Sequence, residues 1–243
     1  MSILQSINDL LKDIICPPMC VVCGKAAPNF VCKECLLKIN FFGDSVCSRC
    51  GSPIFKEFDK LQSEGKICSL CKNEKYYFYK ARSYGLYKNV MADIIKKYKY
   101  KKIYTLKKVL LYFLFMAFKN YYDKEKIDFI ETVPDYVSNL KETWHFNHMQ
   151  DLAKSLSQYL KIPFGNNILK IKENYKQQIL DKDLRKLNVK DAYKIKDCLK
   201  IVGKNILLID DVFTTGSTLN EISRILKYGG ADKIFILTVA RGA

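Results

Sequence analysis

The sequence predicts an α/β fold: a doubly wound, mainly parallel sheet that follows a small, cysteine-rich N-terminal domain. From about residue 76 to the end of the chain, strand-like apolar runs alternate with amphipathic helix patterns, and this alternation is typical of parallel sheets. Nine of the ten cysteines lie before residue 72. We therefore expect two domains, at residues 1–75 and 76–243.

Four C-x-x-C pairs dominate the first domain, and they are typical of structural zinc. One pair directs two thiolates at one ion, and a tetrahedral site needs two pairs, so four pairs predict two zinc ions in a double zinc ribbon. Pairing by successive quartets is the simplest assignment, and a cross-braced exchange of the middle pairs is the alternative. The expected ligands are Cys20, Cys23, Cys32, Cys35, Cys47, Cys50, Cys68 and Cys71.

The beginning of the chain bears on the rival interpretations of these cysteines, which are disulfides and redox pairs. Asp9 and Asp13 interrupt the apolar run that a secretory signal would need. We therefore expect a short amphipathic helix there and a reducing, cytoplasmic location, where disulfides are rare. No βαβ pattern surrounds the pairs, which argues against redox chemistry. Cys16 and Cys198 stand outside the pairs, and we expect both to be ordinary buried thiols.

An apolar stretch at residues 109–118 has about half the ~20 residues that a membrane-spanning helix needs. We expect a helix that is buried in the core. The alternative is an interfacial helix anchored by Lys107 and Lys108, which would place the protein peripherally at the inner face of the membrane. Neither interpretation includes a transmembrane segment.

Besides this stretch, we expect four strands and three helices in the second domain. The strand at 77–87 alternates in polarity, whereas the run at 205–212 contains four successive aliphatic residues, as in a strand buried on both faces of a parallel sheet, and 233–241 is the last expected strand. The fourth strand covers 127–134. Apolar residues at helical spacing predict the helices, which cover residues 88–100, 147–161 and 217–230.

The net charge of +16 at pH 7, from 41 Lys and Arg against 25 Asp and Glu, predicts affinity for phosphate-rich partners such as nucleic acid, nucleotides or anionic lipid. Two stretches, KNEKYYFYKARSYGLYK and KKYKYKKIYTLKK, interleave tyrosine with lysine. This pattern suits the stacking and phosphate contacts that hold single strands. Tyrosines packed on a sheet beside a solvated lysine face would give the same pattern, and the sequence leaves both interpretations open.

The stretch NILLIDDVFTTGSTLNEI, residues 205–222, combines a buried strand with two aspartates and a hydroxyl-rich turn. The strand delivers Asp210 and Asp211 to its carboxyl end, where ligands bind in open α/β sheets. The turn leads into a helix, and the N–H groups and dipole of a helix N-terminus attract phosphate. Carboxylates repel phosphate, so these two are expected to hold sugar hydroxyls or a metal ion. In the alternative, Asp211, Thr214 and Ser217 only cap the helix.

The segment LLIDDVFTTGSTL resembles the phosphoribosyl-pyrophosphate binding loop of type I phosphoribosyltransferases. With the four C-x-x-C pairs, YGLYKNVMADIIKKYKYKK, VPDYVSNLKETWHFNHMQDLAKSL and the terminal ILTVARG, essentially the whole chain is similar to the ComF, or ComFC, family of competence proteins. The resemblance implies a double zinc ribbon fused to a phosphoribosyltransferase-like domain that handles single-stranded DNA in the cytoplasm during natural transformation. The implied partners are single-stranded DNA, proteins of the competence apparatus, and phosphoribosyl pyrophosphate with Mg²⁺.

The resemblance also implies site residues. Asp210 and Asp211 would contact ribose hydroxyls or magnesium, and the 5-phosphate would lie on a group of five residues, Thr214, Thr215, Gly216, Ser217 and Thr218. Further contacts to phosphate or DNA would come from Lys170, Lys172, Gln177, Arg185, His145 and His148. For the two histidines, an ordinary surface or core role is the alternative.

The chain departs from the family pattern at several places that bear on this site. Lys170 and Lys172 stand where the family has arginines, and lysine keeps the charge but loses the two-pronged geometry. After the VP dipeptide, the chain has Asp135-Tyr136-Val137 in place of a proline-histidine run. The handling of pyrophosphate is therefore left open.

Two functions of different class follow. In the first, the protein binds single-stranded DNA or phosphoribosyl pyrophosphate as part of the transformation apparatus, and the net charge and the zinc ribbon favour it. In the second, it is an active phosphoribosyltransferase of nucleotide salvage. Thr214 stands where some relatives carry a carboxylate that could act as acid or base, so the sequence assigns no catalytic residue. A purely structural zinc adaptor would leave the phosphate-binding turn unexplained.

Overall fold

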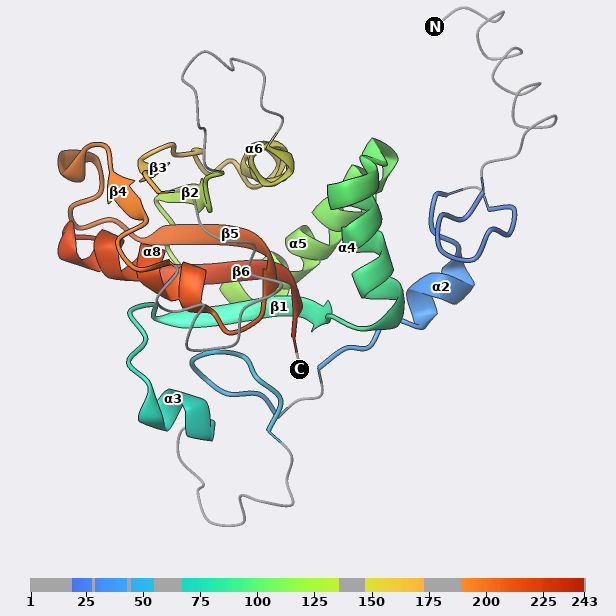
Figure 1. The fold of residues 1–243 in the computed structure, drawn as a ribbon, viewed down its shortest axis with the longest axis horizontal. Coiled ribbons are helices and arrows are strands. Elements are labelled where there is room, and N and C mark those ends of the chain that lie inside the picture. Colours follow the sequence, from blue (N-terminus) through green and yellow to red (C-terminus); the bar gives the residue numbers. More distant parts are fainter. Residues whose placement is uncertain are drawn as a thin grey trace, which may run out of the picture.

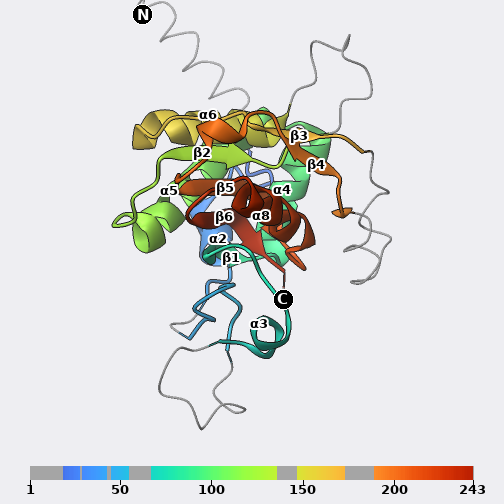
Figure 2. The same cartoon turned by 90° about the vertical axis from the view of Figure 1, so that its left-hand side faces the viewer.

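The main sheet of the protein has four parallel strands, in the order β1-β6-β5-β2. The computed structural model describes residues 19–27, 29–42, 45–54, 67–135, 147–172 and 189–242, so the helix expected within residues 1–16 and Cys16 lie outside the described residues. The strands are β1 (Lys80–Leu86), β2 (Phe129–Thr132), β5 (Ile206–Phe213) and β6 (Ile234–Arg241). Figure 2 shows them in this order, from β2 near the top to β1 at the bottom.

Helices cover both faces of this sheet, as a doubly wound fold requires (Figures 1 and 2). On one face, Leu207 and Ile209 of β5 share a core with α4 (Asn89–Lys101), α5 (Lys107–Tyr122) and α6 (His148–Leu160). On the other face, Ile206 and Leu208 share a second core with α8 (Ser217–Tyr228). Neighbouring residues of one strand therefore enter different cores, which explains the near-continuous apolar run in the sequence.

Helix α5 contains the apolar stretch 109–118, and it belongs to the core. Leu110, Phe113 and Leu114 are buried in the cluster that includes the sheet, and Tyr122 donates a hydrogen bond to the carbonyl of Ile236 at 2.7 Å. Lys107 pairs with Asp151 of α6 at 2.7 Å. The expectation of a core helix is confirmed. Within the described residues, no helix is both long and apolar enough to cross a membrane.

Several small elements were not expected from the sequence. Strands β3 (Ile168–Lys170) and β4 (Tyr193–Ile195) form an antiparallel pair, and each is too short to produce a recognisable periodicity. The 3₁₀ turns η1 (Tyr104–Leu106) and η3 (Cys198–Lys200) are shorter than any pattern that the sequence analysis could use. Cys198 lies at the start of η3 and is exposed, so the expectation that it is a buried thiol was wrong.

The two cysteine-rich segments lie against the sheet at different places. The first segment contains α2 (Lys33–Leu37), and Val31 and Ile39, on either side of this helix in the sequence, share a core with Met91 of α4. The second ends in α3 (Ser69–Asn73), and its cysteines share a core with Phe78 and Phe213. Figure 1 shows α2 beside α4 and α3 at the far end of β1. The division of the chain at residue 75 stays a prediction.

These segments also cover the edge strand β1. The backbone N–H of Leu86 donates to the carbonyl of Asn40 at 2.9 Å, and that of Ala81 donates to the carbonyl of Arg49 at 2.7 Å. An uncovered edge strand would expose such groups to pairing with another chain. The cysteine-rich segments therefore complete the sheet on this side.

Candidate functional site

The turn after β5 begins the candidate site, and a glycine fixes its shape. Gly216 has φ +75° and is the N-cap residue of α8, with no side-chain hydrogen bond to the cap. A Cβ at this position would lie 2.4 Å from the ring of Phe213, so both the backbone conformation and the space require glycine. The side chain that accepts a hydrogen bond from the first N–H of α8 is that of Thr215, whose Oγ1 lies 3.3 Å from the nitrogen of Ser217, and not that of Asp211, Thr214 or Ser217. The first N–H groups of a helix have no intrahelical partner, so those of α8 that no side chain occupies are available to an anionic ligand.

Two carboxyl groups stand at the carboxyl end of β5. The Asp210 side chain accepts a hydrogen bond from the N–H of Asp211 at 2.9 Å, and that of Asp211 accepts one from the N–H of Val212 at 2.8 Å. The other oxygen of Asp211 lies 2.6 Å from the Lys99 ammonium and 3.8 Å from His148 Nε2. The first distance is a charge-assisted hydrogen bond, and the second is too long for a hydrogen bond.

The two aspartates have different charge states. Burial and the neighbouring charge of Asp211 raise the pKa of Asp210 to about 8. Burial would also raise the pKa of Asp211, but His148 and Lys99 outweigh it, and the pKa of that carboxyl lies below its ordinary value. The pair therefore titrates as a unit in which the neighbouring charges favour the proton on Asp210 over Asp211. A neutral carboxyl can donate a hydrogen bond and an anionic one accepts, which suits a pair of sugar hydroxyls.

Lys99 and His148 come from helices on the same face of the sheet. Lys99 lies in the last turn of α4, and His148 is the first residue of α6, whose N-cap Asn147 accepts a hydrogen bond from the N–H of Gln150 at 2.8 Å. The ring of Tyr98 meets His148 edge-on with centroids 6.0 Å apart. His148 Nε2 is buried and has no hydrogen-bond partner among the described residues. Lys99 was missed by the sequence analysis, because its helix contains many lysines with no pattern to single it out.

A cavity of about 550 Å³ joins these groups. Its lining contains the acidic pair, two hydroxyl residues of the turn, and side chains of α4, α6 and β3, among them Asp210, Asp211, Thr214, Thr218, Lys99, His148 and Lys170. Thr215 and Ser217, whose hydroxyls are 2.9 Å apart, instead line a second cavity of about 450 Å³. Of the other expected residues, Lys172 is exposed, while His145, Gln177 and Arg185 lie outside the described residues.

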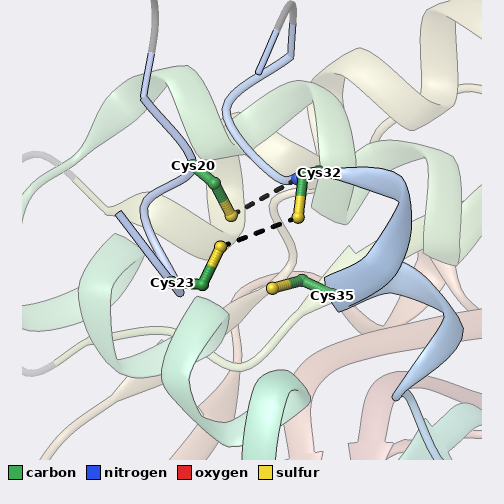
Figure 3. Close-up of side chains that lie close together, drawn as sticks. All are labelled: Cys20, Cys23, Cys32 and Cys35. Atoms are coloured by element: carbon green, nitrogen blue, oxygen red, sulfur yellow. Dashed lines mark hydrogen bonds between the residues drawn. The ribbon is translucent and has the colours of Figure 1, made fainter. Parts of the chain in front are cut away.

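The eight cysteines of the C-x-x-C pairs form two clusters, each made of a successive quartet. In each quartet the four sulfur atoms lie within 4.8 Å of one another. Figure 3 shows the first quartet, in which Cys23 and Cys32 have sulfur atoms 3.7 Å apart and the N–H of Cys32 donates to Cys20 Sγ. The second quartet repeats this arrangement, with Cys50 and Cys68 sulfur atoms 3.6 Å apart. Four converging sulfur ligands fit a tetrahedral zinc ion, and the cross-braced alternative does not apply.

A buried arginine near the carboxyl terminus connects the second quartet with the turn. Arg241 donates to the carbonyl of Cys50 at 2.7 Å and lies 3.5 Å from its sulfur. Its guanidinium stacks on the ring of Phe213, with 4.4 Å between the guanidinium carbon and the ring centroid. Phe213 in turn lies under Gly216. The sequence analysis missed Arg241, because its neighbours along the chain reveal neither its cysteine partner nor its ring partner.

Comparisons with known proteins agree with both halves of this description. Residues 11–72 match the double zinc ribbon domain family, and residues 151–243 match the phosphoribosyl transferase domain family. The chain is 29% identical over 224 residues to Competence protein F of Haemophilus influenzae, covering 88% of this chain and 92% of the relative. It is 24% identical over 235 residues to Competence protein ComFC of Streptococcus pneumoniae, covering 91% and 99%. It is also 31% identical over 97 residues to DNA utilization protein YhgH of Escherichia coli, covering 40% and 42%.

Proposed function

We propose that this chain, which belongs to the ComF family of competence proteins, acts in DNA uptake during natural transformation. Its phosphoribosyltransferase-like domain, which follows the double zinc ribbon, would bind a phosphoribosyl ligand, such as phosphoribosyl pyrophosphate. One observation carries the ligand assignment. The acidic pair lines the same cavity of about 550 Å³ as Thr214, at the beginning of the turn, and Thr218, in the first turn of α8. The proposal places the protein in the cytoplasm, with DNA and proteins of the competence apparatus as partners.

The two parts of the cavity suit the two ends of a ribose phosphate. Asp210 and Asp211 would take the ribose hydroxyls, one as donor and one as acceptor. The N–H groups of the turn, the dipole of α8 and the hydroxyls of Thr214 and Thr218 would take the 5-phosphate. In the same proposal, Thr215 and Ser217 support the turn, because their hydroxyls contact each other at 2.9 Å.

The metal proposals differ for the two kinds of site. Each cysteine quartet has the donor set of a structural zinc site, and we propose one Zn²⁺ in each. The acidic pair does not fit a directly bound Mg²⁺, because the Lys99 ammonium already lies 2.6 Å from Asp211. A divalent cation on that carboxylate would have a positive charge beside it. In this proposal the protein therefore contacts ribose and phosphate without either aspartate coordinating a metal ion.

Calorimetric titration with phosphoribosyl pyrophosphate tests the ligand assignment. We expect Asp210→Asn/Asp211→Asn to weaken binding at least about tenfold, since a hydrogen bond to the charged Asp211 contributes about 1.5–3 kcal/mol. The matched control is Asp232→Asn, which changes an exposed aspartate on the loop before β6. Titrations with Mg²⁺ and with a chelator separate binding by the protein from binding by the metal complex. Absence of binding by the wild-type chain, or equal losses in both variants, would refute the assignment.

An active phosphoribosyltransferase of nucleotide salvage is the second candidate, and one observation favours it. His148 Nε2 is buried against the cavity and has no hydrogen-bond partner in the described part of the chain, so it is placed to hydrogen-bond to an incoming base. Pyrophosphate release in the presence of phosphoribosyl pyrophosphate and each common nucleobase tests this candidate. Release that depends on one base and is lost in His148→Phe would favour the enzyme over a binding protein.

A further inference from the structure

A group of tyrosines and lysines lies on the outside of the molecule, apart from the cavity of the acidic pair. We call it the tyrosine surface, and it consists of Lys75, Tyr77, Tyr79, Tyr228 and Lys233. The first three belong to the extended segment before β1, Tyr228 ends α8, and Lys233 precedes β6. In Figure 1 the beginning of β1 and helix α8 both lie toward the left-hand end of the sheet.

The extended segment separates its aromatic residues into two sets. In extended backbone, alternate residues point to opposite sides, and residues two apart are about 6.6 Å apart. Tyr76 and Phe78 face inward, with ring centroids 4.9 Å apart, and Phe78 meets Phe213 edge-on at 5.9 Å. On the opposite side, Tyr79 is 54% exposed and Tyr77 is half-buried, and the Tyr79 ring meets the buried Phe235 edge-on with centroids 5.5 Å apart. Sheet packing therefore explains the inward set, whereas Tyr79 packs on the sheet by one edge and still leaves about half of its surface exposed.

The outward rings are paired with cations. The Lys75 ammonium lies 5.1 Å from the Tyr77 ring centroid, and that of Lys233 lies 4.9 Å from the Tyr79 ring. Tyr228 is 71% exposed and lies 5.9 Å from Tyr77 between centroids. Aromatic faces next to cations are the arrangement in which bases stack while phosphates meet positive charge.

The lysines of this surface keep their charge available. In the described ranges, no carboxylate oxygen forms an ion pair with the Lys75 or Lys233 ammonium, whereas Arg224 is held by Glu221 at 2.7 Å and by Asp191 at 3.0 Å. Arg224 therefore supports the ring of Tyr228, from which it lies 5.8 Å. The two lysines complement a polyanion.

The segment that carries the surface is fixed in place. The Asn220 side chain of α8 accepts a hydrogen bond from the N–H of Tyr77 at 2.8 Å and donates to the carbonyl of Lys75 at 3.0 Å. Asn220, Lys75 and Arg224 also line the second cavity, together with Thr215 and Ser217 of the turn. The surface thus continues to the outer side of the phosphate-binding turn, and its geometry exists before a ligand arrives.

We propose that the tyrosine surface binds single-stranded DNA, with bases stacked on Tyr228, Tyr77 and Tyr79 and phosphates on Lys75 and Lys233. This inference rests on the proposed role in DNA uptake, and it assigns the DNA to a surface separate from the phosphoribosyl cavity. Stacking tolerates any base, so the surface would hold incoming strands without regard to sequence.

Fluorescence polarisation with a labelled oligothymidylate, longer than the site sizes of about 4–16 nucleotides known for stacking platforms, tests this on the zinc-loaded full chain. We expect Tyr228→Ala to weaken binding about tenfold and Tyr228→Phe to retain it, because the ring does the stacking. Tyr159→Ala is the matched control, since Tyr159 of α6 is also 71% exposed. Lys75→Gln and Lys233→Gln should each reduce the slope of log affinity against log salt by about 0.7.

The outcomes separate this inference from the proposed function. If the wild-type chain binds DNA and Tyr228→Ala binds as Tyr159→Ala does, the surface assignment is wrong while the role in DNA uptake stands. If the wild-type chain binds no single-stranded DNA, both fail. If Tyr228→Ala leaves DNA binding unchanged but weakens binding to vesicles that contain anionic lipid, the surface contacts membrane and the proposal is overturned. Retained DNA binding in Asp210→Asn/Asp211→Asn supports separate sites.

Discussion

Replacing Gly216 by alanine tests whether the turn after β5 owes its shape to a close contact with Phe213. An L residue at φ +75° costs roughly 1–2 kcal/mol of folding free energy. The new Cβ would also lie 2.4 Å from the Phe213 ring. That ring is buried under the Arg241 guanidinium and has little room to move, so overpacking should add roughly 1–3 kcal/mol. We expect Gly216→Ala to lower the free energy of unfolding by about 2–5 kcal/mol.

Gly203→Ala is a control for the backbone contribution alone. Gly203 has a similar φ of +68°, but a Cβ there would have no atom within 4 Å. Urea unfolding of both variants, loaded with zinc, should give a loss of about 1–2 kcal/mol for Gly203→Ala and a clearly larger loss for Gly216→Ala. Phosphoribosyl-pyrophosphate affinity should fall only in Gly216→Ala. Equal losses of stability in the two variants would show that the contact with Phe213 does not constrain the turn.

Three further predictions concern the acidic pair and the second cysteine quartet. The raised pKa of Asp210, about 8, means that the folded chain holds a proton that the unfolded chain releases near pH 4. The contribution of Asp210 to stability therefore decreases as the pH rises from about 4 to about 8. Urea unfolding across this range should show Asp210→Asn gaining stability relative to wild type as pH rises. Parallel pH profiles of the two proteins would contradict the raised pKa of Asp210. Arg241→Met should destabilise the chain by about 2–4 kcal/mol, because it leaves the Cys50 carbonyl unpaired and removes the cation from the Phe213 ring. If the urea midpoint changes no more than in an exposed-site variant, these two contacts of Arg241 do not stabilise the fold. Cys50→Ser should lower the zinc content from two ions per chain to one by elemental analysis, and loss of both ions would indicate that the quartets are not independent.

The elements of the fold could be predicted because burial leaves a local pattern. The runs at 205–212 and 233–241 are mainly apolar because β5 and β6 are covered on both faces. The C-x-x-C spacing is also local, since each pair sits in one turn. The outward side of the segment before β1 could not be predicted, because the same alternation of tyrosines suits a sheet face and an exposed surface. The structure decided it, with Phe78 buried and Tyr79 exposed.

The sequence by itself determined that a buried strand carries Asp210 and Asp211 toward its carboxyl end, that a glycine-containing turn and a helix follow, and that eight cysteines stand in four pairs. Only the tertiary structure decided which side chains meet them. Lys99 reaches Asp211 across 112 positions of the chain, and Arg241 reaches Cys50 across 191. Such contacts follow from the strand order β1-β6-β5-β2, which brings the ends of distant helices to one edge of the sheet. Local residue patterns report burial and turns, but they carry no record of which elements become neighbours.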